Sequence, residues 1–197
     1  MAQEYKYKMP GYIKSERKIA IPFINYLKNT FGLIRVLEIG PGSGLNLSYL
    51  EKEGFKTTAI DISKNMIRVA GEVAPNTKFI HGDFLEYNFK KSSFEGIFAK
   101  AFIHLFPKKD AIQVLKKIKR LLVPKGAVFI ATTVHPKPEE GYFEKTDYIH
   151  KLTRFRKKWT EKELIETLKS LNYNIINKGY YIEKDKNKKW INLLAIV

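Results

Sequence analysis

A glycine-rich segment near the start of the chain has the residue types of a ligand-binding turn. Residues 36–39 are mostly apolar, which is typical of a short buried strand, and Gly40, Gly42 and Gly44 follow at alternate positions. The mixed polar and apolar pattern of a helix comes next. A strand that turns through glycines into a helix places backbone N–H groups at one end of a sheet, where a ligand can contact the main chain directly.

The residues around this turn favour a positively charged ligand over a phosphate. The dinucleotide-binding motif G-x-G-x-x-G would require a glycine where this chain has Leu45. Glu38 lies within the predicted strand, and a buried carboxylate at that position repels phosphate. S-adenosylmethionine carries an ammonium and a sulfonium group and no phosphate, so it suits this site. The alternative is a tight strand–helix turn that binds no ligand.

The segment E-I-G-P-G-S-G at residues 38–44 resembles motif I of the class I S-adenosylmethionine-dependent methyltransferases. This resemblance covers about residues 33–197. It implies an α/β fold with a Rossmann-like, doubly wound, seven-stranded sheet that is mostly parallel and ends in a C-terminal antiparallel β-hairpin. It also implies S-adenosylmethionine as the cofactor, with motif I contributing Glu38, Gly40, Pro41, Gly42 and Gly44 to its site.

A carboxylate ends the second predicted strand, residues 55–61. Asp61 at its tip is placed to accept two hydrogen bonds from a ribose diol, and the resemblance assigns it that role beside Ile62. The alternative is that Asp61 caps a helix. We favour ribose binding, because Ser63 already offers an N-cap for the helix predicted over residues 64–73.

A second acid follows the third predicted strand, residues 78–81. The resemblance implies that Asp83 accepts a hydrogen bond from the adenine amino group. It further implies that the backbone N–H of Phe84 serves a ring nitrogen and that the Phe84 ring flanks the base. The alternative for Asp83 is an Asx-turn at the end of the strand.

The fourth predicted strand, residues 94–100, leads to the candidate catalytic residue. The resemblance places Ala99 and Lys100 under the methionine part of the cofactor. His104 lies beyond the C-terminal end of this strand, where ligands bind in doubly wound sheets. A histidine with an ordinary pKa can remove a proton from an acceptor O–H or N–H group, so His104 is the candidate base. A packing or cofactor-facing role in a short turn before Pro107 stays open.

Two further segments are candidates for binding the methyl acceptor. Residues 135–158 are predicted to form a long loop, which inside a compact domain is usually functional. From it we predict Tyr142, Tyr148 and Arg154 as acceptor contacts. Residues 1–32 are predicted to form a helical and aromatic lid ahead of the methyltransferase domain at 33–197, with Tyr12 as its acceptor contact. Local packing of these aromatic side chains is the alternative in both segments.

The remaining elements are predicted from helix and turn signals. Asp110 is predicted to cap a helix, and Thr160 opens another through the capping box T-x-x-E. A Pro-Lys-Gly turn precedes the fifth strand. The other predicted segments are helices at 16–31 and 45–53, the second ended by Gly54, and strands at 127–134, 173–182 and 189–197.

Composition limits the partners. The chain has 197 residues and a net charge of +16, but thirty of its 36 basic residues are lysines. Nucleic-acid contacts favour arginine, so we predict a small-molecule acceptor that is methylated on an O or N atom. An RNA or protein methyltransferase that uses the basic surface is the alternative, motivated by the local concentration of charge at residues 151–158.

Several site types and locations are not expected. The chain has no cysteine, which excludes disulfides, thiolate metal sites and a cysteine nucleophile. It has no H-E-x-x-H pattern or acidic cluster, so no metal is predicted. There is no apolar run long enough to span a membrane and no signal-peptide core, which favours a cytoplasmic protein.

Overall fold

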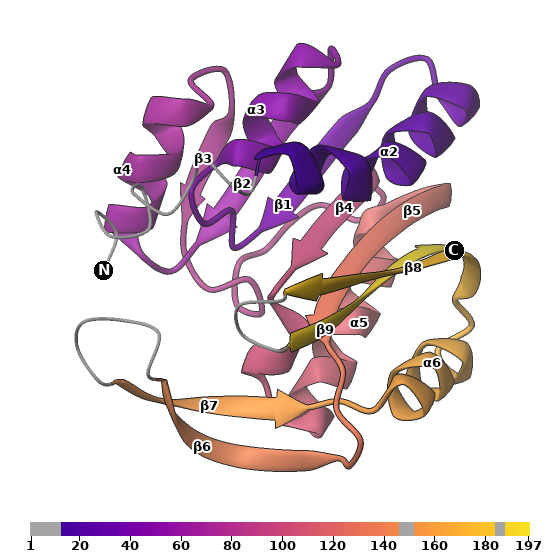
Figure 1. The fold of residues 1–197 in the computed structure, drawn as a ribbon. Helices are drawn as coiled ribbons and strands as arrows, with labels where there is room; N and C mark the ends of the chain where they lie inside the picture. The colour runs from indigo at the N-terminus through magenta and orange to yellow at the C-terminus, as the bar shows by residue number, and fades with distance from the viewer. Residues whose placement is uncertain (1–12, 146–151, 184–187) are drawn as a thin grey trace.

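A seven-stranded sheet forms the centre of the protein (Figure 1). The structure is a computed structural model, and it describes residues 13–145, 152–183 and 188–197. In spatial order the strands are β3 (Lys78–His81), β2 (Lys56–Asp61), β1 (Arg35–Ile39), β4 (Phe94–Lys100), β5 (Leu122–Thr133), β9 (Lys188–Ile196) and β8 (Asn174–Glu183).

The strand directions confirm the predicted fold class. Strands β1 to β5 run parallel to one another, whereas β9 is antiparallel to both β5 and β8. Leu37 in β1 lies beside Thr58 in β2 and Ile97 in β4, which fixes the register at the centre. Because parallel strands point the same way, the carboxyl ends of β1 to β5 meet at one edge of the sheet.

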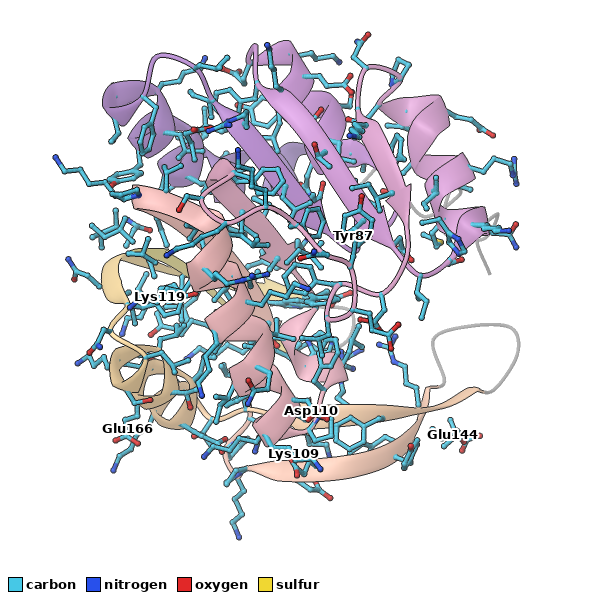
Figure 2. The ribbon with its side chains drawn as sticks, turned by 180° about the vertical axis from the view of Figure 1, so that it is seen from behind. Tyr87, Lys109, Asp110, Lys119, Glu144 and Glu166 are labelled. Carbon is cyan, nitrogen blue, oxygen red and sulfur yellow. The ribbon has the colours of Figure 1, made fainter. Side chains whose placement is uncertain are left out.

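Helices cover both faces of the sheet (Figure 1). Helices α2 (Ile13–Thr30), α3 (Leu45–Lys52) and α4 (Lys64–Val73) pack on one face. Helices α5 (Lys108–Leu121) and α6 (Glu161–Ser170) belong to the hydrophobic cluster of the other face, and α5 stands in front of the sheet in Figure 2. Both sheet faces are therefore buried, as expected for strands that are nearly continuous apolar runs.

Alternate residues of β1 and β4 face the two helical layers. Val36 and Phe98 belong to the cluster on the α2 side, whereas Leu37 and Ile97 belong to the cluster on the α5 side. This is the two-residue period of a strand that is buried on both faces. Burial of this kind stabilises the sheet by roughly 1.5–3 kcal/mol for each large apolar side chain.

Helix α2 packs closely on β4, because Gly96 has no side chain. A Cβ atom at Gly96 would lie 2.6 Å from side-chain atoms of both Phe23 and Leu27, which are themselves fully buried. The described part of the predicted N-terminal lid is therefore a core helix. Tyr12 lies outside the described residues, so its predicted lid role stays a prediction.

The opposite layer is joined by hydrogen bonds as well as by apolar packing. The buried Tyr173 hydroxyl donates to the Leu115 carbonyl of α5 at 2.8 Å. Lys119 of α5, labelled in Figure 2, donates to the carbonyls of Leu171 and Asn172 after α6. The two Lys119 bonds satisfy carbonyls directly after α6, where the helix itself offers no donor.

The prediction of a loop at residues 135–158 is wrong. These residues contain a separate two-stranded antiparallel ribbon, β6 (Glu139–Lys145) and β7 (Leu152–Lys158), which lies below α5 in Figure 1. Its strands carry opposite charges, and Glu139 and Glu140 stand opposite Lys158 and Lys157. Cross-strand pairs of opposite charge stabilise an antiparallel ribbon, and a search for apolar strands misses them.

Two local predictions need correction. Asp110 does not cap α5, since the helix begins at Lys108 after Pro107, and Asp110 lies in its first turn (Figure 2). A proline pre-sets the backbone for a helix start, and a carboxylate in the first turn favours the helix dipole. Strand β5 also begins five residues before the predicted start at 127, because Leu122 pairs with Phe94 ahead of an irregularity.

Other local predictions are confirmed. The Ser63 side chain caps α4, and the Thr160 side chain accepts a hydrogen bond from the Glu163 N–H at 3.1 Å. Strands β3 and β4 and helix α4 have the predicted bounds. No helix among the described residues is long and apolar enough to cross a bilayer. The cytoplasmic location stays a prediction.

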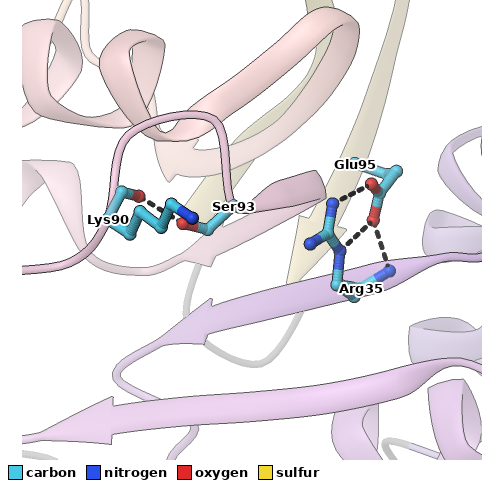
Figure 3. Close-up of polar contacts among 4 residues, drawn as sticks. All are labelled: Arg35, Lys90, Ser93 and Glu95. Carbon is cyan, nitrogen blue, oxygen red and sulfur yellow. Dashed lines mark hydrogen bonds and ion pairs between the residues drawn. The ribbon is translucent and has the colours of Figure 1, made fainter.

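An ion pair joins β1 and β4 near their amino ends (Figure 3). The Arg35 guanidinium contacts both carboxylate oxygens of Glu95, and the Arg35 backbone N–H donates to one of them at 2.7 Å. In the turn before β4, the Ser93 hydroxyl donates to the Lys90 carbonyl. This amino edge lies at the far end of the strands from the predicted site.

Candidate active site

The glycine turn after β1 has the backbone shape that requires glycine. Gly40, Gly42 and Gly44 have φ angles of 68°, 55° and 81°, in the left-handed region. A Cβ atom at Gly44 would also lie 2.7 Å from the Ala70 carbonyl oxygen of α4. The turn therefore brings the start of α3 against α4, while Gly40 and Gly42 stay partly exposed after β1.

Glu38 is buried beside this turn. Glu38 is 2% exposed, and its Oε1 accepts a hydrogen bond from the Asn46 side-chain amide at 3.1 Å. Asn46 lies in the first turn of α3, so the helix that follows the glycines also orients the acid before them. A buried carboxylate in this position suits a cationic ligand group.

Asp61 ends β2 at the same edge of the sheet. Its Oδ1 accepts a hydrogen bond from the Ser63 N–H at 2.8 Å, and Ser63, not Asp61, caps α4. Burial raises the pKa of Asp61, and the Ser63 hydrogen bond partly opposes that rise. A partly desolvated carboxylate is a good acceptor for hydroxyl groups. Next to it, the Ile62 side chain is 71% exposed.

Asp83 follows β3 in the predicted position, and its Oδ1 accepts a hydrogen bond from the Leu85 N–H at 2.6 Å. This is the local turn weighed as the alternative in the sequence, and it leaves the other carboxylate oxygen for a ligand. The Phe84 ring is 4% exposed and packs edge-on against Phe102. The structure therefore places the Phe84 ring in the core.

The end of β4 has a strained residue directly after the predicted cofactor contacts. Ala99 is buried and Lys100 is partly exposed at the tip of the strand. Ala101 has a φ of 56° and donates its N–H to the Ala131 carbonyl at 2.8 Å. Strain of this kind costs of order 1–3 kcal/mol and clusters at functional sites.

His104 is buried and bonded at both ring nitrogens. It lies in the short helix η1 (Ile103–Leu105) and is 1% exposed. Its Nδ1 lies 2.8 Å from Thr132 Oγ1, and its Nε2 lies 3.0 Å from a terminal nitrogen of Arg156. A guanidinium only donates hydrogen bonds, so Nε2 accepts and the ring proton sits on Nδ1. In this arrangement the lone pair of Nε2 is directed at Arg156.

The two faces of the β6–β7 ribbon have different surroundings. Arg154 and Arg156 share one face with Phe143, since side chains alternate along a strand and Arg154 stands opposite Phe143. Tyr142 lies on the other face and is 77% exposed. The structure therefore brings Arg154 onto the face that meets His104 and does not bring Tyr142 there. Tyr148 lies outside the described residues.

Three polar residues of this region, Arg156, Thr132 and His135, were not predicted from the sequence. The spacing of the two arginines in R-F-R was the available signal for Arg156, because alternate residues of a strand share a face. His135 follows β5 and its Nε2 lies 3.1 Å from Thr133 Oγ1. Burial lowers the pKa of His135, and the positive charges of Lys158 and Arg156 lower it further.

The residues at this edge fit S-adenosylmethionine. Three carboxylates belong to the same edge of the sheet as the glycine turn: Glu38 near the end of β1, Asp61 at the end of β2 and Asp83 after β3. Carboxylates accept hydrogen bonds from ammonium, hydroxyl and amino groups but repel phosphate. In the part of the chain that the structure describes, no three His, Asp or Glu side chains gather as a metal-binding group.

Two comparisons find proteins that are similar to this chain in sequence. A family model described as a methyltransferase domain matches residues 36–126. An uncharacterized methyltransferase of Alkaliphilus oremlandii is 30% identical over 167 residues, which cover 81% of this chain and 73% of that protein.

Two solved structures share the fold at lower identity. One is the 1,6-didemethyltoxoflavin-N1-methyltransferase of Burkholderia thailandensis with bound 1,6-didemethyltoxoflavin and S-adenosylhomocysteine. It has a TM-score of 0.76 at 17% identity, over 98% of this chain and 84% of that one. The other, a SAM-dependent methyltransferase of Methanosarcina mazei, has a TM-score of 0.71 at 23% identity, over 86% of this chain and 95% of that one.

Proposed function

The chain belongs to the class I S-adenosylmethionine-dependent methyltransferases, and we propose that it methylates an O or N atom of a small-molecule acceptor. The observation that carries this proposal is the position of the β6–β7 ribbon. It contacts η1 directly after β4 through Arg156 and His104, so the ribbon lies over the chain at the carboxyl end of β4. A small acceptor suits such a covered site.

The proposal assigns the cofactor to the edge formed by β1 to β4. Glu38 holds the ammonium group, Asp61 the ribose and Asp83 the adenine amino group. The exposed Ile62 side chain covers one face of the base. The contact of the Phe84 ring with the base stays a prediction, and that ring is buried. The backbone N–H of Phe84 remains the proposed partner of the ring nitrogen.

When bound, S-adenosylmethionine supplies a methyl group that its sulfonium has already activated. The residues of the chain therefore have to position the acceptor and exclude water. The hydrogen bonds of His104 to Thr132 and Arg156 support its role as a positioning residue and not as a base. Arg154, on the same ribbon face as Arg156, stays a proposed acceptor contact.

Contacts within the protein weaken the case for an RNA methyltransferase that uses the basic surface. The concentration of charge at residues 151–158 suggested it, yet three of these cations have partners within the protein. Lys157 pairs with Glu163 and Lys158 with Glu139, while Arg156 contacts His104. Cations engaged in this way contribute less to phosphate binding than exposed ones.

Calorimetric titration with S-adenosylhomocysteine tests the proposed function. We expect saturable binding, weakened by about 1–3 kcal/mol in Asp61→Ala because a charged hydrogen bond is lost, or roughly 5- to 150-fold in Kd. Asp110→Ala is the matched control, since Asp110 lies in the first turn of α5 and outside the proposed cofactor edge. Folded protein that gives no heat with this nucleoside would contradict the proposal.

A further inference from the structure

Two lysines of α5 each hold a pair of main-chain carbonyls, and one pair belongs to the proposed cofactor site. Lys117 donates to the carbonyls of Leu85 and Tyr87 at 2.8 and 2.7 Å. We infer that Lys117 is a positioning residue for the cofactor base, because it fixes the turn at residues 83–87 whose groups recognise a 6-aminopurine. This inference rests on the proposed function, since it takes Asp83 as the partner of the adenine amino group.

The turn at residues 83–87 folds back on Asp83 through its own hydrogen bonds. The Leu85 N–H donates to Asp83 Oδ1 at 2.6 Å, and the Tyr87 N–H donates to the Asp83 carbonyl at 2.9 Å. Lys117 holds the carbonyls of the same two residues, which ties them to α5 as well. An ammonium group has three donors and can bind two carbonyls at once. The position of Asp83 relative to α5 therefore depends on Lys117.

The same ammonium group acts on both residues that are proposed to contact the base. It lies 5.4 Å from the ring centroid of Phe84, a cation–π contact with the residue whose backbone N–H is the proposed partner of the ring nitrogen. That ring is buried and packs edge-on against Phe102, which anchors the turn to the core. Burial lowers the pKa of Lys117, Arg120 lowers it further, and the charge of Asp83 opposes this. The attraction between Lys117 and Asp83 adds to the hydrogen bonds of the turn.

Lys119 makes the same kinds of contact outside the proposed cofactor edge. It donates to the carbonyls of Leu171 and Asn172, in the turn between α6 and β8. Its ammonium group lies 5.6 Å from the ring centroid of Tyr173. Residues two apart on a helix do not share a face, so the two lysines hold different parts of the protein. Helix α5 therefore supplies a matched control, since Lys117 reaches the turn after β3 and Lys119 does not.

The test compares two nucleosides that differ only at the base. S-adenosylhomocysteine has an amino group and a ring acceptor where S-inosylhomocysteine has a carbonyl oxygen and an N–H, so the second loses both proposed contacts. Each is titrated calorimetrically into the full chain. We expect the wild-type chain to bind S-adenosylhomocysteine roughly tenfold to hundredfold tighter, because a hydrogen bond to a charged group is lost in the other nucleoside.

Substitution of each lysine by methionine locates the effect, since methionine keeps most of the apolar stem. In Lys117→Met the preference for S-adenosylhomocysteine should fall about fivefold, because Asp83 and the Phe84 N–H are no longer held in place. Lys119→Met should keep the preference within about twofold, because distant sites act independently. Lys117→Arg restores donors for two carbonyls and should recover most of the preference. A loss of stability alone does not change the preference, because unfolding weakens the binding of both nucleosides equally.

The outcomes separate this inference from the proposed function. A wild-type chain that binds neither nucleoside contradicts the proposed function, and this inference with it. A Lys117→Met variant that keeps the wild-type preference overturns this inference alone. Equal losses of preference in Lys117→Met and Lys119→Met also overturn it, because the change would then not depend on the turn after β3. A wild-type chain that binds both nucleosides equally contradicts the proposed contact of Asp83 with adenine and overturns this inference as well.

Discussion

The two halves of the candidate site are built in different ways. The cofactor half consists of glycines and acids that lie within a few residues of strand ends, from Glu38 to Asp83. The acceptor half consists of side chains that meet across long separations, 28 residues for His104 and Thr132 and 52 for His104 and Arg156. Local sequence therefore determines the first half, and tertiary packing determines the second.

A side chain added at Gly44 should disrupt the cofactor half of the site most strongly. Gly44→Ala adds a Cβ atom 2.7 Å from the Ala70 carbonyl oxygen and strains a φ of 81°. We expect a loss of about 3 kcal/mol in the free energy of unfolding, because overpacking adds to backbone strain. Urea denaturation measures it, and nucleoside affinity should fall with it.

Gly54→Ala is the matched control for this change. Gly54 has a φ of 86°, but nothing lies within 4 Å of the Cβ that alanine would add. Its cost is then strain alone, about 1 kcal/mol. Equal losses at Gly44 and Gly54 would show that the close approach of α3 and α4 at Gly44 has no energetic weight.

In the acceptor half, the substitution with the largest expected effect removes the Lys157–Glu163 ion pair. Lys157→Met keeps the apolar stem but removes the buried partner of Glu163, which retains Lys108 at 3.0 Å. We expect a loss of about 2 kcal/mol in the free energy of unfolding, with nucleoside affinity within twofold of wild type.

Lys162→Met is the control for Lys157→Met, since Lys162 pairs only at 3.9 Å with Glu166 on the exposed side of α6 (Figure 2). Its unfolding midpoint should stay unchanged. A Lys157→Met variant as stable as Lys162→Met would mean that the ribbon is not fastened through this pair.

The smallest expected effect lies at the amino edge, outside both halves. Burial opposes ionisation of Glu95, but hydrogen bonds from Arg35 outweigh it and lower the pKa of Glu95 below its usual 4.5. A lowered folded pKa stabilises the protein fully above the unfolded value, and that stabilisation is lost as pH falls through the folded pKa. Because Arg35 is 42% exposed, we expect only about 1 kcal/mol.

Glu95→Gln should therefore unfold more easily at pH 7 and lose less stability than wild type on acidification below about pH 4.5. Thermal melts across pH 3 to 7 measure this, with the exposed Glu86→Gln as control. If Glu95→Gln and wild type lost equal thermal stability on acidification, the Arg35–Glu95 ion pair would not contribute to stability. Nucleoside affinity at pH 7 should not change.

The cofactor half could be predicted from the sequence better than the acceptor half, because its contacts are local. The glycine turn, Asp61 and the strand bounds of β3 and β4 came from local patterns, which act over a few residues. The β6–β7 ribbon was missed because its strands are charged and pair with each other. Arg156 was missed because its partner, His104, is brought to it only by the fold.

A crystal structure with S-adenosylhomocysteine bound would show whether the cofactor lies at the edge formed by β1 to β4. We expect the ribose hydroxyls within hydrogen-bond distance of Asp61, the base against Ile62 and the sulfur near the end of β4, below the ribbon face of Arg156. A nucleoside bound away from the carboxyl ends of β1 to β4, or one whose ribose makes no contact with Asp61, would contradict it.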